Sequence, residues 1–102
     1  MASEGYHEAL DRLSADTMDM HRAIMSLMEE LEAADWYNQR IDAAVDEELK
    51  QILVHNRDEE KEHAVMLLEW IRRHDPKMDE ELRKRLFKDG PIAARGHDED
   101  AD

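Results

Sequence analysis

The chain has 102 residues, a net charge of −13 and no cysteine, which limits it to one small domain without disulfide bonds or thiolate zinc sites. The negative charge argues against nucleic acid and anionic membranes as partners, because both attract basic surfaces. No apolar run approaches the roughly 20 residues that span a bilayer, and no signal-like segment leads the chain, so we expect a soluble cytoplasmic protein. Between residues 6 and 75 there is neither glycine nor proline, which is typical of an all-α protein.

The N-terminal residues 1–7 are short and polar, and we expect them to be flexible. A first long helix is predicted to begin between Glu8 and Ser14, with Ser14 as a candidate N-cap. Its apolar residues recur at alternating intervals of four and three, as in a helix that packs along one seam. This seam consists of Leu13, Thr17, Met20, Ile24, Leu27, Leu31 and Ala34. A second stripe, displaced by one residue, consists of Ala23, Leu27, Glu30, Ala34 and Tyr37, which places Glu30 at or inside the buried face.

A turn is predicted near Asp42–Val45, although no glycine or proline marks it. The apolar pattern changes phase there, and the acidic residues 46–48 suit an N-cap and a first helical turn. A second long helix should then run to about Arg73 and end at Asp75-Pro76, because proline disfavours helical backbone in the residue before it.

A short third helix is expected from about Asp79 to Lys88, with Leu82 and Leu86 on one face and Phe87 beside them. The remaining residues 92–102 form a predicted flexible acidic tail. Residues 8–91 therefore form the predicted folded domain. Two long antiparallel helices and a short third helix cannot bury both apolar seams. We therefore expect a homodimer that completes a ferritin-like four-helix bundle by two-fold symmetry.

The apolar seam of the second helix is interrupted in its middle by polar residues. Its members are Leu49, Leu53, Asn56, Glu60, His63, Leu67 and Trp70. Glu60 and His63 share one helix face, and this Glu-x-x-His spacing occurs in the bundle core of di-iron and di-manganese carboxylate proteins. Two other interpretations stay open, a solvated helix face and a buried polar pair that sets the helix register. Glu4 and His7 have the same spacing in a polar segment, and we assign them no role.

A di-iron bundle site needs two single glutamates and two Glu-x-x-His pairs. One chain supplies Glu30, Glu60 and His63, which is half of that set, and a two-fold dimer doubles it to four carboxylates and two imidazoles. Four carboxylates would neutralise two Fe²⁺ ions. Tyr37 lies two turns beyond Glu30 and is either a hydrogen-bonding neighbour of the centre or an amphipathic residue near a helix end.

Other charged residues near this motif are weaker candidates. Glu29 and Glu32 flank Glu30 and are either solvated charges or a cation route. His55, Glu59 and His63 form a competing row with a spacing of four. This row drifts by about 80° around the helix, so its members cannot all face inward. The remaining histidines, His21, His74 and His97, have no convergent partners and are expected at the surface.

Three segments resemble the encapsulated ferritins. Residues 28–37, 55–64 and 68–70 read MEELEAADWY, HNRDEEKEHA and LEW, and the likeness extends over about residues 7 to 92. The resemblance implies a half-ferritin that pairs to form a ferroxidase centre, with dimers assembled into an open, ring-shaped decamer. It also implies that the protein oxidises Fe²⁺ inside an encapsulin nanocompartment, whose shell holds the mineral.

Carried over residue by residue, the resemblance makes Glu30, Glu60 and His63 the iron ligands and places Tyr37 near the centre. It assigns Glu29, Glu32 and Trp36 to an outer metal-uptake site. Family members usually carry a short Gly/Leu-rich targeting peptide in a flexible tail, and residues 93–102 show no such peptide.

Iron is the expected metal, two ions per dimer, and other divalent cations would compete for the same ligands. The alternative to a ferroxidase is a non-enzymatic helical-hairpin oligomer or metal-binding scaffold with a buried polar layer. A haemerythrin-like oxygen carrier would need more inward-facing histidines than the chain provides.

Overall fold

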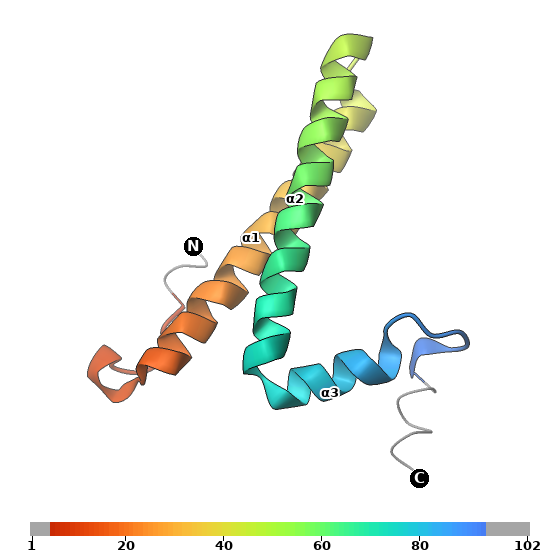
Figure 1. Cartoon of the computed structure of the whole chain (residues 1–102). Helices are drawn as coiled ribbons and strands as arrows, with labels where there is room; N and C mark the ends of the chain where they lie inside the picture. Colours follow the sequence, from red (N-terminus) through yellow and green to blue (C-terminus); the bar gives the residue numbers. More distant parts are fainter. Residues whose placement is uncertain (1–4, 94–102) are drawn as a thin grey trace.

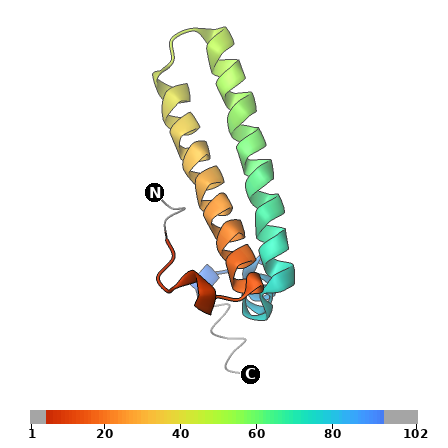
Figure 2. The same ribbon diagram turned by 90° about the vertical axis from the view of Figure 1, so that its left-hand side faces the viewer.

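The computed structural model describes residues 5–93 as two long antiparallel helices and a short third helix. Helices α1 (Ala15–Ala43) and α2 (Glu47–His74) lie side by side and form a hairpin, as Figure 2 shows. Helix α3 (Pro76–Arg85) turns away from the base of the hairpin (Figure 1). A short 3₁₀ turn, η2 (Leu10–Arg12), precedes α1. Residues 5–93 contain no strand, which confirms the all-α prediction.

Each α-helix begins at a residue whose side chain caps its free N–H groups. Ser14 Oγ accepts a hydrogen bond from the Thr17 amide at 3.1 Å, so the predicted N-cap of α1 is confirmed. The carboxylates of Asp46 and Asp75 play the same part for α2 and α3. A cap of this kind typically stabilises a helix by about 1 kcal/mol. The turn at residues 44–46 agrees with the predicted break near Asp42–Val45.

The predicted limits of the third helix are wrong. The helix begins at Pro76 and ends at Arg85, about three residues earlier than expected at both ends. Proline fits the first helical position, where its missing N–H is not needed, and Asp75 caps the turn. Phe87 was expected beside Leu82 on a helix face, but it lies beyond the helix with a φ of 58° and is fully exposed.

The hairpin packs through small residues. The buried positions among those described are Ala23, Ala34, Ala64 and Ile71, and three of these four are alanine. Alanine at a helix contact lets two backbones approach closely. No helix in residues 5–93 contains a segment long and apolar enough to cross a membrane.

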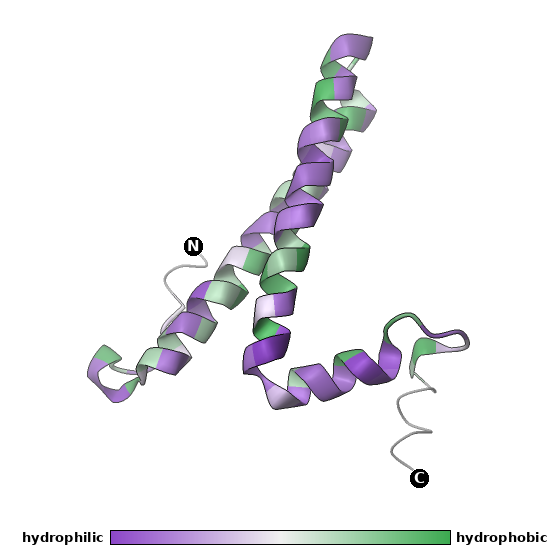
Figure 3. Ribbon diagram, viewed as in Figure 1, coloured by the Kyte–Doolittle hydropathy of each residue, from purple (hydrophilic) through white to green (hydrophobic). Residues whose placement is uncertain are grey.

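Within one chain, the most deeply buried face of each long helix is not the predicted apolar seam. On α1 the second stripe, with Ala23 and Ala34, packs against α2, whereas Ile24 and Leu31 of the first seam are 42% and 54% exposed. On α2 the buried residues Ala64 and Ile71 follow directly after His63 and Trp70 of the seam. Figure 3 shows hydrophobic residues along both long helices, interleaved with hydrophilic ones. Large apolar side chains thus remain available for a partner.

A network of ion pairs joins α3 to the end of α2. Arg72 contacts Glu69 at 2.8 Å, and it also pairs with Asp79 of α3. Hydrogen bonds from Arg72 and Arg73 lower the pKa of Glu69 to about 2, and Arg72 and Arg83 lower the pKa of Asp79. These contacts set the angle between the two helices, which no sequence spacing predicts.

Candidate metal centre

Antiparallel pairing brings the predicted ligands of α1 and α2 together halfway along the hairpin. Glu60 and His63 are one turn apart on α2, and Glu30 lies opposite them on α1. His63 Nδ1 is 3.5 Å from Glu30 Oε2 and 3.8 Å from Glu60 Oε2. One donor atom from each of the three residues lies within 4.8 Å of the others. We call Glu30, Glu60 and His63 the donor triad.

The triad holds two neighbouring carboxyl groups, and the presence of Glu30 makes Glu60 harder to ionise. The pKa of Glu60 is raised, first by its hydrogen-bonding contact with Glu30 and then by burial and by repulsion from the Glu30 charge. His63 acts in the opposite direction. Glu30 Oε2 is buried, and none of the residues from 5 to 93 offers it a hydrogen bond. A bound cation would satisfy this oxygen and remove the repulsion.

The triad opens to the outside of the hairpin. The His63 side chain is 47% exposed, whereas those of Glu30 and Glu60 are 26% and 24% exposed. Two carboxylates and one imidazole suit first-row divalent ions such as Fe²⁺, Mn²⁺ and Zn²⁺. Three donors on one side of a bound ion would leave its other side open to ligands from another chain.

Comparison with known proteins identifies the family. A sequence model of the family described as EncFtn-like matches residues 5–89. The chain belongs to the EncFtn-like family. It is 60% identical over 93 residues to the "Encapsulated ferritin-like protein" of Rhodospirillum rubrum, a match that covers 91% of this chain and 66% of that protein.

Two further relatives show a similar likeness. A "Ferritin-like protein" of Thermotoga maritima is 52% identical over 88% of this chain and 79% of its own length. The "Encapsulin nanocompartment cargo protein EncC" of Myxococcus xanthus is 36% identical over 81% of this chain and 64% of its own length. The chain therefore spans about two thirds of the length of two of these relatives.

A solved structure supports the fold. The crystal structure of a Nitrosomonas europaea protein superimposes with a TM-score of 0.84 at 66% sequence identity. The match covers 87% of this chain and 98% of the other chain. The helical hairpin with its third helix is thus a feature shared with an experimental structure.

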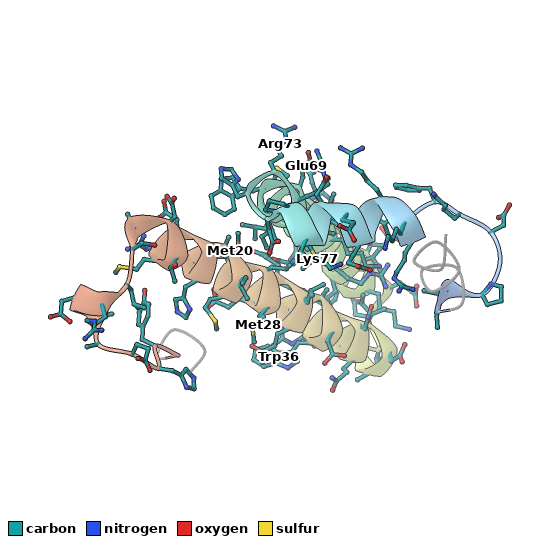
Figure 4. The ribbon with its side chains drawn as sticks, turned by 90° about the horizontal axis from the view of Figure 1, so that it is seen from below. Met20, Met28, Trp36, Glu69, Arg73 and Lys77 are labelled. Carbon is teal, nitrogen blue, oxygen red and sulfur yellow. The ribbon has the colours of Figure 1, made fainter. Side chains whose placement is uncertain are left out.

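The remaining predicted site residues lie outside the donor triad. Tyr37 is half-buried on α1, and the Arg40 guanidinium carbon lies 5.4 Å from the centre of its ring. Glu29 and Glu32 are exposed, and Trp36 is 49% exposed. In Figure 4, Trp36 and Met28 project from the same edge of α1, on the opposite side of the molecule from Glu69 and Arg73 of α2. The roles of Tyr37 and of the outer metal-uptake site stay predictions.

The competing row on α2 does not converge. His55 Nε2 pairs with Glu59 Oε1 at 3.3 Å, whereas His63 faces Glu30 and Glu60. The donor triad therefore draws its ligands from both long helices rather than from one helix face. His74 is exposed and stacks on Trp70, with 3.9 Å between ring centres.

His21, which was expected at the surface, is half-buried. Its ring lies 4.3 Å from that of Tyr6, and its Nε2 atom is buried. This contact depends on the N-terminal segment folding back over α1, which hydrophobic periodicity does not reveal. A hydrogen bond between Arg57 and Asn38, 3.1 Å long, also joins the two long helices and has no sequence signature. His97 lies outside the described residues.

Proposed function

We propose that the protein is a ferroxidase that oxidises Fe²⁺ to Fe³⁺ at a di-iron centre formed across a homodimer. The observation that carries this proposal is the donor triad, which places two carboxylates and one imidazole within 4.8 Å of one another. Its exposed side offers a second chain access to the same metal ions. Iron is the substrate, and dioxygen or peroxide would accept its electrons.

The ligand count supports a shared centre. Two copies of the triad provide four carboxylates and two imidazoles, which is the set that ferritin-like di-iron bundles use. Four negative charges balance two Fe²⁺ ions, so both metals can bind close together. Other divalent cations that accept oxygen and imidazole ligands would compete for the same positions.

The apolar surface supports the homodimer. Ile24, Met28 and Leu31 are between 42% and 54% exposed on α1, and Ile52 and Met66 on α2 are 52% and 59% exposed. Burial of such side chains is the main driving force for association. Exposed apolar residues on both long helices also favour assembly of dimers into the ring-shaped decamer that the family resemblance implies.

The names of the relatives support a place inside an encapsulin shell. The Myxococcus xanthus relative is named as an encapsulin cargo protein, and the Rhodospirillum rubrum relative as an encapsulated ferritin-like protein. We infer that this protein supplies Fe³⁺ for mineral storage within a cytoplasmic encapsulin nanocompartment. Co-expression with the encapsulin shell protein, followed by purification of intact shells, tests whether the chain is packaged.

The surface of α1 supports an outer metal-uptake site. Glu29, Glu32 and Trp36 are exposed close to Glu30 in sequence, and carboxylates at a surface raise the local concentration of cations. In this proposal they collect Fe²⁺ before it reaches the donor triad. Tyr37 would stand near the centre as a hydrogen-bonding neighbour of a ligand.

Fe²⁺-dependent oxygen consumption tests the ferroxidase. Glu60→Gln removes one ligand charge without changing the size of the side chain, so turnover should be lost. Glu62→Gln is the matched control, because Glu62 is exposed on the same helix and lies outside the triad. If wild type forms no Fe³⁺ from Fe²⁺ with either dioxygen or peroxide, the protein is instead a helical oligomer or metal-binding scaffold with a polar register layer.

A further inference from the structure

Phe87 presents an exposed aromatic ring from a backbone conformation that phenylalanine rarely adopts. It is the second residue after the end of α3, and its φ of 58° lies in the left-handed region. Glycine or asparagine usually occupies such a position after a helix, because a bulky side chain clashes with its own backbone there. The side chain is nevertheless fully exposed, so packing within the chain does not compensate for the strain. Strained residues of this kind concentrate at binding sites.

The loop that carries Phe87 is held against α3. Arg85 Nη1 donates a hydrogen bond to the Ile92 carbonyl oxygen at 2.6 Å, which ties the returning segment to the helix. Beside the loop lies a hollow of about 470 Å³. It is lined by Leu82, Arg83, Leu86 and Phe87 together with Glu69 and Arg72 of α2, and we call these six residues the α3 corner. An anchor that is already ordered loses little entropy when it binds a partner.

The α3 corner lies in a region with excess positive charge. Three arginines share two carboxylates there, since Arg72, Arg73 and Arg83 pair with Glu69 and Asp79. Residues 76–88 contain five basic and three acidic residues, in a chain whose net charge is −13. The complementary partner is therefore an acidic surface with an apolar side chain for the hollow.

The other end of the hairpin has this complementary composition. Residues 42–48 at the turn between α1 and α2 include four acidic residues and no basic one, and we call them the acidic tip. Val45 at the centre of the tip is 90% exposed. Lys50 follows the tip and lies 3.8 Å from one of its acids, Glu47. The tip thus offers an apolar side chain surrounded by negative charge.

One chain cannot join its own acidic tip to its own α3 corner. The two surfaces lie at opposite ends of α2 (Figure 1), whose 28 residues span about 42 Å at 1.5 Å per residue. A second copy can supply the tip, because two hairpins that pack antiparallel place each tip beside the base of the other. Every copy of the chain therefore carries the matching partner for the corner.

The α3 corner lies on a different side of the hairpin from the donor triad. Arg72 follows His63 by nine residues, which corresponds to about 180° around an α-helix. A chain docked at the corner is therefore not the chain that would complete the metal centre.

We propose that the α3 corner binds the acidic tip of a second copy of the chain, with Val45 seated against Phe87 and the arginines facing the carboxylates. Two chains packed antiparallel form this contact twice by two-fold symmetry. Chains that use both this contact and the interface across the donor triad build assemblies larger than a dimer. The contact does not rest on the proposed ferroxidase function, because it requires no metal.

Cross-linking tests the contact directly, because the chain has no cysteine of its own. The full chain carries Val45→Cys and Phe87→Cys and is treated with a short bis-maleimide linker in buffer with a chelator. Covalent dimers should form, and each must join two chains because the two positions lie at opposite ends of one hairpin. A chain with Val45→Cys and Leu10→Cys is the matched control and should link much less. Leu10 is 54% exposed and lies in η2, at the same end of the hairpin as the corner (Figure 2).

Phe87→Asn tests the aromatic anchor. Asparagine tolerates left-handed backbone, so the fold of the chain should be kept while the ring is lost. Co²⁺ accepts the same ligands as Fe²⁺ and serves to occupy the donor triad. Under these conditions, analytical ultracentrifugation should show that the dissociation constant of assemblies larger than a dimer rises about tenfold or more. Leu10→Asn is the control and should leave that constant unchanged, whereas salt should raise it in wild type by screening the charges.

Equal cross-linking of the two double-cysteine chains, or none in the chain with Val45→Cys and Phe87→Cys, would overturn the proposal. So would equal cross-linking in a chain with Val45→Cys or Phe87→Cys alone, because like ends would then meet. An unchanged oligomer distribution in a folded Phe87→Asn variant would contradict the role of the ring. Absence of iron oxidation in wild type would instead overturn the ferroxidase and leave these results standing, since neither readout uses turnover.

Discussion

Glu30 and His63 face each other from opposite helices, with 3.5 Å between Glu30 Oε2 and His63 Nδ1. The buried alanines make this distance possible. Ala34 lies one turn beyond Glu30 on α1, and Ala64 directly follows His63 on α2. Small side chains at these positions allow the two backbones to approach, so the geometry of the metal ligands depends on the packing of the hairpin.

Enlarging one of these alanines should therefore affect both stability and metal binding. Ala64 is 5% exposed, and Ala64→Leu would force the helices apart. Overpacking of a well-packed contact typically costs about 1–3 kcal/mol. We expect the free energy of unfolding to fall by that amount and Co²⁺ binding at the triad to weaken. Chemical unfolding of metal-free protein and Co²⁺ titration measure the two effects.

Val65→Leu is the matched control for this substitution. Val65 is the next residue on α2 and is 63% exposed, so the added methylene should change stability by less than about 0.5 kcal/mol. Unchanged stability and Co²⁺ affinity in Ala64→Leu would show that the alanine contact does not set the distance between the ligands.

The stability of the metal-free protein should fall with rising pH because of Glu60. Contact with Glu30, together with burial, raises its pKa in the folded state above the ordinary glutamate value of 4.5. The folded state therefore binds the Glu60 proton more tightly than the unfolded state does. This contribution to stability is fully present below the unfolded pKa and is lost as pH rises through the folded pKa.

The variant Glu60→Gln isolates this effect, because it has no proton to lose. In buffer with a chelator, the melting temperature of Glu60→Gln should therefore rise relative to that of wild type as the pH increases from 4.5 toward neutrality. Fe²⁺ or Co²⁺ should reverse the trend in wild type, since metal stabilises the ionised carboxylates. A parallel pH dependence of both proteins would mean that Glu60 titrates as it does in the unfolded chain.

Much of this fold could be predicted from residue patterns. The two long helices, the Ser14 cap and the break near Val45 each follow from apolar spacing or capping chemistry. Placement of Glu30, Glu60 and His63 in one cluster also follows from their positions on helix stripes. These features depend on contacts that are local along the chain or repeat with the helix period.

Other features depend on contacts that the hydrophobic periodicity of the sequence does not reveal. The α3 helix begins early because Asp75 caps it and Pro76 fits its first turn, and its angle is set by Arg72. The contact between Tyr6 and His21 requires the N-terminal segment to reverse direction. The deeply buried stripe on α1 is the one that contains Glu30, because alanines rather than larger apolar residues fit the close helix contact.

The outer acidic residues should influence the rate of iron uptake rather than the chemistry. Glu29 and Glu32 are exposed and lie outside the donor triad. Glu32→Ala, alone or combined with Glu29→Ala, should therefore slow Fe²⁺ oxidation at low iron concentration while turnover at saturating iron persists. Stopped-flow measurement of Fe³⁺ formation separates these two regimes. Complete loss of turnover in an intact oligomer would make these residues ligands of the centre.

The final prediction is that assembly is linked to metal. Without metal, a dimer would bring four carboxylates from Glu30 and Glu60 together across the two-fold axis. Groups of like charge at that distance cannot all stay ionised, so some must bind protons or the interface must loosen. Fe²⁺ would cancel the charge and bridge the chains, and a ligand that binds only the assembled state stabilises it.

Native mass spectrometry should therefore show smaller species for metal-free wild type and restoration of the larger oligomer by Fe²⁺. Glu60→Ala should behave differently, because it removes two of the four carboxylates in each dimer. The variant would assemble without metal, since less repulsion opposes the contact, yet it would fail to oxidise iron. Wild type that shows one oligomer distribution with and without Fe²⁺ would mean that metal plays no part in holding the dimer together.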